Sequence, residues 1–387
     1  MALDTHQIVK SRSRRPWVTD RPSIHRKRIL AMATNPMTGP STRFRIVQWR
    51  SMLEQAGFSL ALDSFYSDTA ARVLYRRGWW PAKAAYSLSG TVRRLGRLRQ
   101  AARQADVLWI HRETFPLGLT IGLDHVRRFP GPKIYDYDDA MFLPQRQGRA
   151  MLARLERLDT PKQVMACCDV VMAGNQFLAE YAREHARRVV VLPTCIDTTR
   201  FCPRSGVKPN AVPTIGWVGS HSTAKYLSDL RRVLERVATT HRFRFSVVGA
   251  PDGLTLGGVP VESRPWALAT EVDDFQRCDI GVYPLWDDPW ARGKCGFKAI
   301  QFMGCGVPVV ASAVGVNREI IEDGVNGLLA STEDEWIEKL TRLMNDPALR
   351  QRIGQAGRRT IEQRYSLTVH GPTLINTFHD LLRSRRL

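Results

Sequence analysis

Short apolar runs separated by amphipathic stretches recur along the whole chain. Runs of consecutive apolar residues predict strands that are buried on both faces. Because helical periodicity falls between them, the pattern predicts parallel sheets covered by helices on both sides. The expected strands are 29–33, 58–62, 107–111, 134–137, 170–173 and 189–192, then 214–218, 243–248, 280–283 and 307–311; the expected helices include 41–55, 151–166, 176–184 and 223–239.

A proline-rich stretch divides this alternation into two halves. Pro193, Pro203, Pro209 and Pro213 lie between the last strand of one half and the first strand of the next, as in an interdomain linker. The predicted fold class is α/β, with two Rossmann-like doubly wound domains facing a cleft that is the default ligand site. The expected division is an arm at 1–28, a first domain at 29–193, a linker at 194–213, a second domain at 214–370 and a C-terminal helix at 371–387, with packing back on the first domain as one option for that helix.

The charge balance indicates an anionic partner. Lys and Arg number 57 against 37 Asp and Glu, a net charge of +20, which favours a nucleotide, a phospholipid surface or a nucleic acid. The first 28 residues are basic and poor in apolar side chains, and we expect them to be disordered. Their basic residues are Lys10, Arg12, Arg14, Arg15, Arg21, Arg26, Lys27 and Arg28.

The compartment is expected to be the cytoplasm. The seven cysteines are odd in number and fit no zinc spacing, which predicts reduced thiols. No apolar run reaches the roughly 18 residues of a spanning helix, and the basic N-terminus lacks the apolar core of a secretory signal. The sequence therefore predicts a cytoplasmic protein, either soluble or peripheral on the inner face of a membrane.

The second half contains a strand–loop–helix segment at 216–225 that suits a diphosphate. Gly219 lets backbone approach a ligand closely, Thr223 can cap the following helix, and Lys225 lies one turn into it, with Ser220 in the loop. The alternative is an ordinary strand–helix turn with a solvated lysine.

A second segment, 293–312, carries a basic stripe. Lys294, Lys298 and Gln301 stand at i, i+4 and i+7, which predicts one shared helix face. Two lysines four residues apart repel each other unless an anion lies between them. The alternative is a solvated basic face.

The segment 300–312, with 279–284, 314–321 and 323–329, resembles the donor site of family 4 glycosyltransferases (glycosyl transferases group 1). The likeness covers most of 214–365 and is weaker, but in order, across 29–193. These are GT-B enzymes, so the resemblance implies hexosyl transfer from a nucleotide sugar, bound by the second domain, to an acceptor, bound by the first. It further implies retention of anomeric configuration. We expect no metal or covalent cofactor, since the Asp-x-Asp segment lies in the half opposite the donor site, and a role in cell-surface polysaccharide or glycolipid synthesis.

The same resemblance assigns donor-binding residues. Lys225 matches the lysine that holds the donor diphosphate, and Ser220 replaces its usual arginine neighbour. Of the family's paired glutamates, the one that grips the ribose is Gln301 and the other falls on Gly293; Asp288, in an insertion, is the expected catalytic stand-in. The donor set is Gly219, Ser220, Thr223, Lys225, Lys294, Lys298, Gln301, Asn317 and Glu319.

The first half supplies candidates for the acceptor. His111 ends a strand, and a histidine at this position in similar enzymes lies beside the reacting sugar; the alternative is a histidine satisfied within a loop. The segment 136–139 contains Asp-x-Asp, which suits either a divalent metal or, in our preferred interpretation, acceptor hydroxyls or a loop cap. The acceptor set is Gly39, Arg43, Arg45, Asp138 and Asp139.

A basic amphipathic segment at 69–105 has no acidic residue. Its apolar positions and tryptophans suit the surface of an anionic membrane, and the alternative is a helix packed on the first domain. The basic residues are Arg72, Arg76, Arg77, Lys83, Arg93, Arg94, Arg97, Arg99 and Arg103, and the apolar residues are Trp79, Trp80, Leu88, Val92, Leu95 and Leu98.

Three functions remain open from sequence. The preferred one is a metal-independent glycosyltransferase acting on a glycan or lipid-linked acceptor at an anionic membrane, without a nucleic-acid partner. A sugar-nucleotide epimerase on the same fold would need an acid/base set that we do not find. A basic membrane- or nucleic-acid-binding protein without transferase activity would explain the charge, but no nucleic-acid motif supports it.

Overall fold

The computed structural model describes residues 26–75, 78–116, 120–144, 158–204, 206 and 210–384. Residues 1–25 of the expected arm, Arg76 and Arg77 of the basic segment, Pro209 of the linker and residues 151–157 of the expected helix 151–166 lie outside the described residues. Within the described residues, no helix is both long enough and apolar enough to cross a bilayer.

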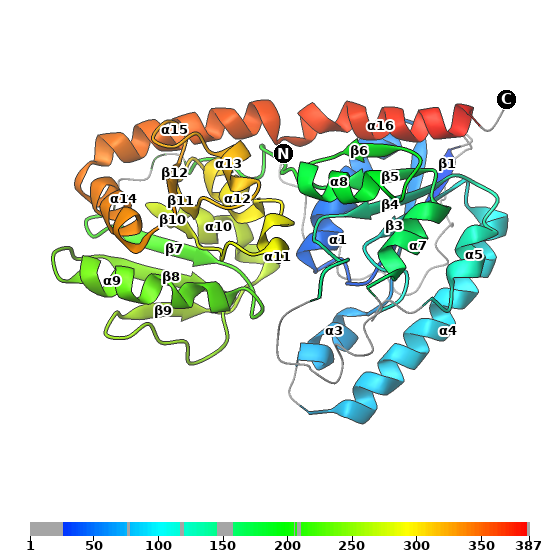
Figure 1. Ribbon diagram of the computed structural model, residues 1–387, viewed down its shortest axis with the longest axis horizontal. Helices are drawn as coiled ribbons and strands as arrows, with labels where there is room; N and C mark the ends of the chain where they lie inside the picture. The colour runs from blue at the N-terminus through cyan, green and yellow to red at the C-terminus, as the bar shows by residue number, and fades with distance from the viewer. Residues whose placement is uncertain are drawn as a thin grey trace.

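The first domain is built on a six-stranded parallel sheet with the order β2-β1-β3-β4-β5-β6. Its strands lie where the apolar runs predict them, and helices cover both faces (Figure 1). The strands are β1 (Lys27–Ala33), β2 (Phe58–Ser64), β3 (Val107–His111), β4 (Lys133–Tyr137), β5 (Val170–Ala173) and β6 (Val189–Val191), and the helices are α1 (Pro40–Arg45), η2 (Val47–Trp49), α2 (Arg50–Gln55), α3 (Asp68–Tyr75), α4 (Trp80–Gln104), α5 (Leu123–Arg127), α7 (Thr160–Cys167) and α8 (Gln176–Arg183).

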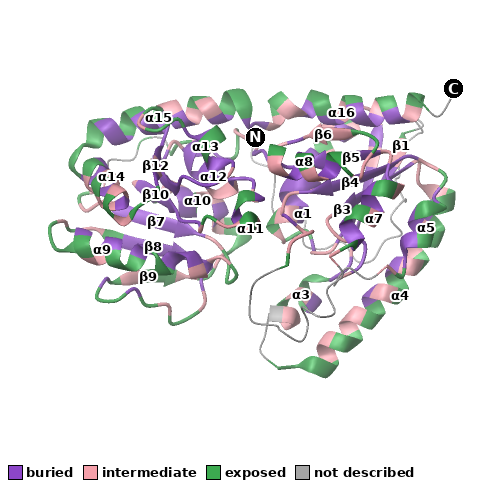
Figure 2. Cartoon of the chain, in the orientation of Figure 1, coloured by how far each residue is buried: buried purple, intermediate pink, exposed green. Residues whose placement is uncertain are grey.

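The second domain repeats this architecture, with the strand order β12-β11-β10-β7-β8-β9. Figure 2 shows that the strands of both sheets are mainly buried. The strands are β7 (Thr214–Val218), β8 (Arg244–Val248), β9 (Val261–Arg264), β10 (Ile280–Tyr283), β11 (Val309–Ser312) and β12 (Leu328–Ala330), and the helices are η4 (Ala224–Ser228), α9 (Leu230–Ala238), η5 (Leu268–Thr270), α10 (Glu271–Gln276), α11 (Pro289–Arg292), α12 (Phe297–Gly304), α13 (Asn317–Ile320), α14 (Glu333–Asn345), α15 (Pro347–Arg364) and α16 (Leu367–Arg383).

The last helix joins the two domains. Helices α15 and α16 follow each other along one side of the molecule, α15 beside the second domain and α16 beside the first (Figure 1). Leu374 and Phe378 of α16 are fully buried in the core of the first domain, where Phe378 contacts Phe58 and Trp109. The C-terminal segment therefore contributes to the core of the N-terminal domain.

Several expected boundaries were wrong. β1 begins at Lys27, inside the expected arm, because Arg28 N donates to the Asp106 carboxylate and Lys27 N to Gly57 O. The expected helix 41–55 is interrupted at Ile46, which leaves helical dihedrals. Strands β9 and β12 were not predicted; β9 is a largely exposed edge strand and β12 is very short, so neither gives a long apolar run.

Candidate active site

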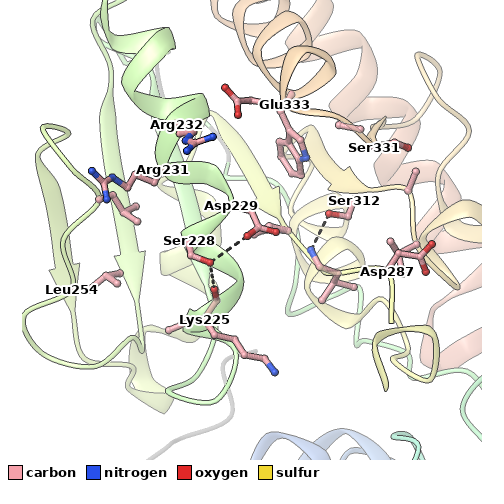
Figure 3. Close-up of a pocket in the computed structure, with 18 of the residues that line it drawn as sticks. Lys225, Ser228, Asp229, Arg231, Arg232, Leu254, Asp287, Ser312, Ser331 and Glu333 are labelled. Atoms are coloured by element: carbon pink, nitrogen blue, oxygen red, sulfur yellow. Dashed lines mark hydrogen bonds between the residues drawn. The ribbon is translucent and has the colours of Figure 1, made fainter. Parts of the chain in front are cut away.

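A groove of 1190 Å³ lies at the carboxyl ends of the strands of the second sheet (Figure 3). Pro284 and Leu285 follow β10, and Ser312 ends β11; its Oγ accepts a hydrogen bond from Leu285 N at 2.9 Å. Lys225 and Arg232 reach the groove from η4 and α9. This is the edge at which open parallel sheets bind their ligands.

Lys225 is the cation of this groove that the sequence singled out. Its Nζ lies 4.8 Å from the ring centroid of Trp286 and 4.9 Å from that of Tyr226. Burial lowers the pKa of Lys225, Asp288 opposes that shift, and Lys294 adds to it. Among the described residues no carboxylate forms an ion pair with Lys225, so its charge is available to an anionic ligand.

The loop that leads to Lys225 differs from the expected helix start. The expected helix 223–239 is divided into the 3-10 helix η4 and α9, and Thr223 does not cap either of them. Its Oγ1 instead accepts a hydrogen bond from Ser220 N at 2.9 Å. A β-carbon at Gly219 would lie 2.2 Å from the Trp217 ring, so the glycine is required for packing. The segment expected to bind the diphosphate is therefore a loop, and η4 is too short for a helix dipole to bind an anion there.

The prediction that Lys294, Lys298 and Gln301 share a helix face was wrong. Gly296 has φ +62° and α12 begins only at Phe297, so Lys294 lies in the turn before the helix. Its Nζ is 3.7 Å from Asp139 Oδ1 in the first domain. A left-handed residue of this kind ends helical periodicity, and glycine is the residue that adopts it without cost.

Lys298 and Gln301 do lie together. Lys298 Nζ donates to Gln301 Oε1 at 2.8 Å, and burial lowers the pKa of Lys298 to about 8, an effect that Glu271 opposes. Gln301 is fully buried, and its Nε2 has no partner among the described residues. Because Lys298 occupies the amide oxygen, Gln301 presents a hydrogen-bond donor where the family's glutamate is an acceptor.

The guanidinium of Arg43 is buried and is not accessible to a glycosyl acceptor. Its guanidinium donates to Glu271 Oε1 at 2.5 Å, and Arg200 donates to Oε2 of the same carboxylate at 3.0 Å. Arg43 belongs to α1 of the first domain and Glu271 to α10 of the second, so this ion pair joins the domains. The expected acceptor role of Arg43 is corrected to an interdomain contact.

Arg45 is also buried, with 1% of its side chain exposed. Its Nε and Nη2 donate to the two oxygens of Asp136 at 2.9 and 2.7 Å, and Nη1 donates to Leu192 O. Arg45 was expected to bind the acceptor, but in the structure its guanidinium is occupied by Asp136 and Leu192 O. Sequence reasoning missed this role because the partner lies 91 positions away.

His111 ends β3 and is buried. Its Nδ1 lies 2.9 Å from Asp136 Oδ1, and its Nε2 lies 3.8 Å from Asp138 Oδ1 with no hydrogen-bond partner among the described residues. Burial alone would raise the pKa of Asp136, but Arg45 and His111 lower it below its usual value.

Asp138 and Asp139 are held by Arg112. Arg112 Nε donates to Asp138 and Nη2 to Asp139, each at 2.6 Å. Arg112 has φ +63°, a strained conformation for a side chain of this size. Burial opposes the effect, but Arg112 and His111 lower the pKa of Asp138 well below its usual value. Within the described residues no cluster of three or more His, Cys, Asp or Glu is arranged to hold a metal ion.

Two further side chains form hydrogen bonds between the domains. Asn175 Nδ2 of the first domain donates to Gly293 O at 3.2 Å and to Lys294 O at 3.0 Å in the second. Cys295 Sγ donates to Asp138 O at 3.3 Å. Asn175 follows the strand 170–173, so its place at the domain boundary could have been predicted. No feature of the sequence indicated that Glu271 would lie at this boundary.

The remaining expected residues lie around these groups. Asp288 caps α11, accepting from Ala291 N at 2.7 Å. Asn317 is buried with its Oδ1 unpaired among the described residues, and Glu319 is exposed on α13. Gly39 precedes α1 after β1; a β-carbon there would lie 2.9 Å from Asn35 Cβ.

Comparison with known proteins agrees with this geometry. Residues 212–346 match the family model described as Glycosyl transferases group 1. The second domain is therefore similar to that of group 1 glycosyltransferases over these residues. The resemblance noted in the sequence is thereby confirmed.

Curated relatives include D-inositol 3-phosphate glycosyltransferases. The protein from Stackebrandtia nassauensis is 25% identical over 258 residues, 58% of this chain and 57% of the relative. The protein from Actinosynnema mirum is 30% identical over 223 residues, 50% of this chain and 53% of the relative. The chain therefore spans about half the length of the curated relatives it matches.

Solved structures share the whole two-domain glycosyltransferase fold. Sucrose-phosphate synthase from Thermosynechococcus elongatus has a TM-score of 0.71 at 15% identity, covering 93% of this chain and all of that one. HepE from Anabaena, solved in complex with UDP-glucose, has a TM-score of 0.62 at 15% identity, covering 91% of this chain and 99% of that one. The predicted GT-B fold is confirmed.

Proposed function

We propose that the protein transfers a hexosyl group from a nucleotide sugar to a glycan or lipid-linked acceptor, in the synthesis of a cell-surface polysaccharide or glycolipid. The observation that carries this proposal is the groove at the carboxyl ends of the second sheet, with the ammonium of Lys225, which forms no ion pair with any described residue. The groove belongs to the group 1 glycosyltransferase domain, and HepE, a protein of the same fold, was solved with UDP-glucose.

The chemistry needs positive charge at the leaving diphosphate. When the glycosidic bond to the diphosphate breaks, negative charge develops on the departing oxygen, and fixed cations stabilise it. Lys225 supplies such a charge, with Lys294 close enough to lower its pKa. The acceptor approaches from the first domain, where His111 ends β3. Retention of anomeric configuration is part of the proposal on the strength of the family resemblance.

Replacing Lys225 by alanine is expected to weaken binding of a nucleoside diphosphate by about 1.5–3 kcal/mol, the range for hydrogen bonds to charged groups. Thermal-shift titration measures this, because a ligand at 100 times its Kd stabilises the folded state by about 2.7 kcal/mol. Lys162→Ala, an exposed lysine of α7, is the matched control. Equal nucleotide affinity in wild type and Lys225→Ala would refute the assignment.

Turnover is proposed to need no divalent metal. Arg112 pairs with both Asp138 and Asp139, Lys294 lies 3.7 Å from Asp139, and Arg45 pairs with Asp136, so these carboxylates are poor ligands for a cation. Activity is expected to persist in excess EDTA. Loss of activity that manganese or magnesium restores would instead favour the Asp-x-Asp segment as a metal site.

The acceptor is proposed to be presented at an anionic membrane by an apolar face of α4. Trp80, Leu88 and Val92 are 64%, 67% and 64% exposed, and α4 projects from the first domain (Figure 1). Arg99 and Arg103 lie on the same side, eleven residues beyond Leu88 and Val92 along the helix. The set of residues expected to face the membrane was partly wrong, because Leu98 is buried in the core and Arg94 is fully buried against Asp63.

The double variant Arg99→Glu with Arg103→Glu is expected to lower binding to phosphatidylserine vesicles more than tenfold, since each basic residue near such a surface contributes about 1 kcal/mol. Co-sedimentation at low and high salt measures this. Arg352→Glu with Arg359→Glu, on exposed positions of α15, changes the net charge equally and is expected to retain binding. Equal loss in both variants would mean that net charge, and not α4, determines attachment.

A further inference from the structure

Lys294 and Asp139 meet across the boundary between the two domains. Lys294 precedes α12 in the second domain, and its Nζ lies 3.7 Å from Asp139 Oδ1, in the loop after β4 of the first. Both side chains are partly exposed, at 16% and 20%. The separation exceeds that of a hydrogen bond, and Lys294 Nζ donates none to the residues that the structure describes. The ammonium is therefore attracted to this carboxylate without being fixed by it.

The charges of this loop balance only when Lys294 is included. Arg112 Nε and Nη2 donate to Asp138 and Asp139, each at 2.6 Å, so one guanidinium serves two carboxylates. Lys294 is the second cation, and the four side chains together carry no net formal charge. If Lys294 moved away, one negative charge would remain. The Oδ1 atom of Asp139, which faces Lys294, could then accept a hydrogen bond from another donor.

Lys294 also lies close to the cation of the groove. Burial lowers the pKa of Lys225, and the charge of Lys294 adds to that effect. Burial raises the pKa of Tyr226 to about 12, and the charge of Asp139 adds to that effect. The Tyr226 ring in turn lies 4.9 Å from Lys225 Nζ. Lys294 is therefore placed between a carboxylate of the first domain and the groove of the second.

A diphosphate in the groove would compete with Asp139 for Lys294. A diphosphate at Lys225 carries more negative charge than one carboxylate, so it attracts a nearby ammonium more strongly. A lysine side chain is a point charge on a flexible four-carbon stem, so a change of rotamer can turn it from one anion to the other. Conversely, the attraction between Asp139 and Lys294 opposes binding of the diphosphate.

We propose that Lys294 is shared between Asp139 and the donor diphosphate, so that binding of the donor releases Asp139 Oδ1 to accept a hydrogen bond from an acceptor hydroxyl. The two substrates then bind in order, with the donor first. This proposal deepens the proposed function and rests on it for the identity of both substrates. Because such coupling is reciprocal, the same interaction must weaken donor binding as long as Asp139 holds Lys294.

Asp139→Asn is expected to bind UDP more tightly than wild type, by about fivefold or more, the lower end of the usual coupling between linked sites. The amide oxygen can still accept from Arg112, but the charge that attracts Lys294 is removed. Isothermal titration calorimetry on the full chain at low salt measures the affinity. Asp138→Asn is the matched control, because it makes the same change of charge in the neighbouring residue, and it should alter UDP affinity far less.

A second set of variants separates competition for Lys294 from a general loss of negative charge. In the background of Lys294→Met, Asp139→Asn should no longer tighten UDP binding, whereas in the background of Lys294→Arg, which keeps the charge, it should. Circular dichroism checks that each variant is folded. A gain of equal size with and without a cation at position 294 would overturn the proposal, because Asp139 would then act on UDP directly. Folded Asp139→Asn protein with wild-type UDP affinity would overturn it too.

Inorganic pyrophosphate is a second probe that is independent of the nucleotide base. It should reproduce the pattern seen with UDP, because the competition concerns the diphosphate alone. Wild-type protein that binds neither UDP nor pyrophosphate would overturn the proposed function together with this inference. Wild-type protein that binds either probe, with no coupling between positions 139 and 294, would overturn this inference and leave the proposed function standing.

Discussion

Replacing Glu271 by alanine is expected to lower the free energy of unfolding by about 3–5 kcal/mol, the usual cost of removing one partner of a buried ion pair. Glu271 is 1% exposed and accepts from Arg43 and Arg200. Lys298 lies near the same carboxylate. Burial lowers the pKa of Lys298, and the negative charge of Glu271 opposes this effect. Without Glu271, three cations would remain at the domain boundary with no carboxylate between them.

Urea unfolding followed by circular dichroism measures this loss. Arg200→Ala removes a partner of the same carboxylate that is 39% exposed, so its cost is expected to be at most about 1 kcal/mol. Glu271→Gln keeps an oxygen that can accept from Arg43 and should fall between the two. Similar losses for Glu271→Ala and Arg200→Ala would mean that the Arg43 contact contributes little to holding the domains together.

The fold could be predicted because its determinants are local. Each strand of a doubly wound sheet is a short apolar run, and the runs at 107–111, 170–173, 214–218 and 280–283 have the boundaries seen in the structure. The missed strands were β9, which has few buried residues, and β12, which is very short. A largely exposed edge strand need not be apolar, so hydrophobic patterning contains little information about it.

The partners of buried charges could not be predicted from sequence. Arg43 and Arg45 were expected to bind the acceptor. Their carboxylates, Glu271 and Asp136, lie 228 and 91 positions away along the chain. Arg94 is similar: spacing placed it on a basic helical surface, but its guanidinium pairs with Asp63 and donates to Ala33 O. Charge alone does not indicate whether an arginine faces solvent or a buried carboxylate.

Local backbone geometry also separates residues that their sequence spacing predicted to share one helix face. The i, i+4 relation of Lys294 and Lys298 holds only within one helix, and Gly296 precedes the start of α12. As a result Lys294 lies near Asp139, whereas Lys298 lies near Glu271 and Gln301. The two lysines therefore meet different neighbours, and Lys294 is the one whose charge acts on Lys225.

The absence of a side chain at position 293, where the resemblance leads one to expect a glutamate, has a steric explanation. A β-carbon on Gly293 would lie 2.6 Å from Ala140 Cβ and 3.1 Å from Ala140 N. Ala140 belongs to the loop after β4 in the first domain, directly beyond Asp138 and Asp139. The two domains touch at this point, and Asn175 donates to Gly293 O beside it. A side chain at 293 is incompatible with this contact.

Restoring the glutamate should therefore harm the protein. Gly293→Glu is expected to separate the loop 138–140 from the second domain, break the Asn175 hydrogen bonds and reduce turnover more than tenfold. Even Gly293→Ala should lower the free energy of unfolding by about 1–3 kcal/mol, the typical cost of overpacking. Gly258→Ala, where nothing lies within 4 Å of the added β-carbon, is the matched control and should cost little.

A second substitution distinguishes steric conflict from other effects of the side chain. In the background of Gly293→Ala, the change Ala140→Gly removes the methyl group at 2.6 Å and leaves the backbone contact at 3.1 Å. The double variant should recover part of the lost stability, giving a favourable coupling of about 0.5–3 kcal/mol between the two positions. Strictly additive losses would show that the domains do not meet at Gly293 and Ala140 in solution, and the absence of a glutamate at 293 would then need a chemical explanation in place of a steric one.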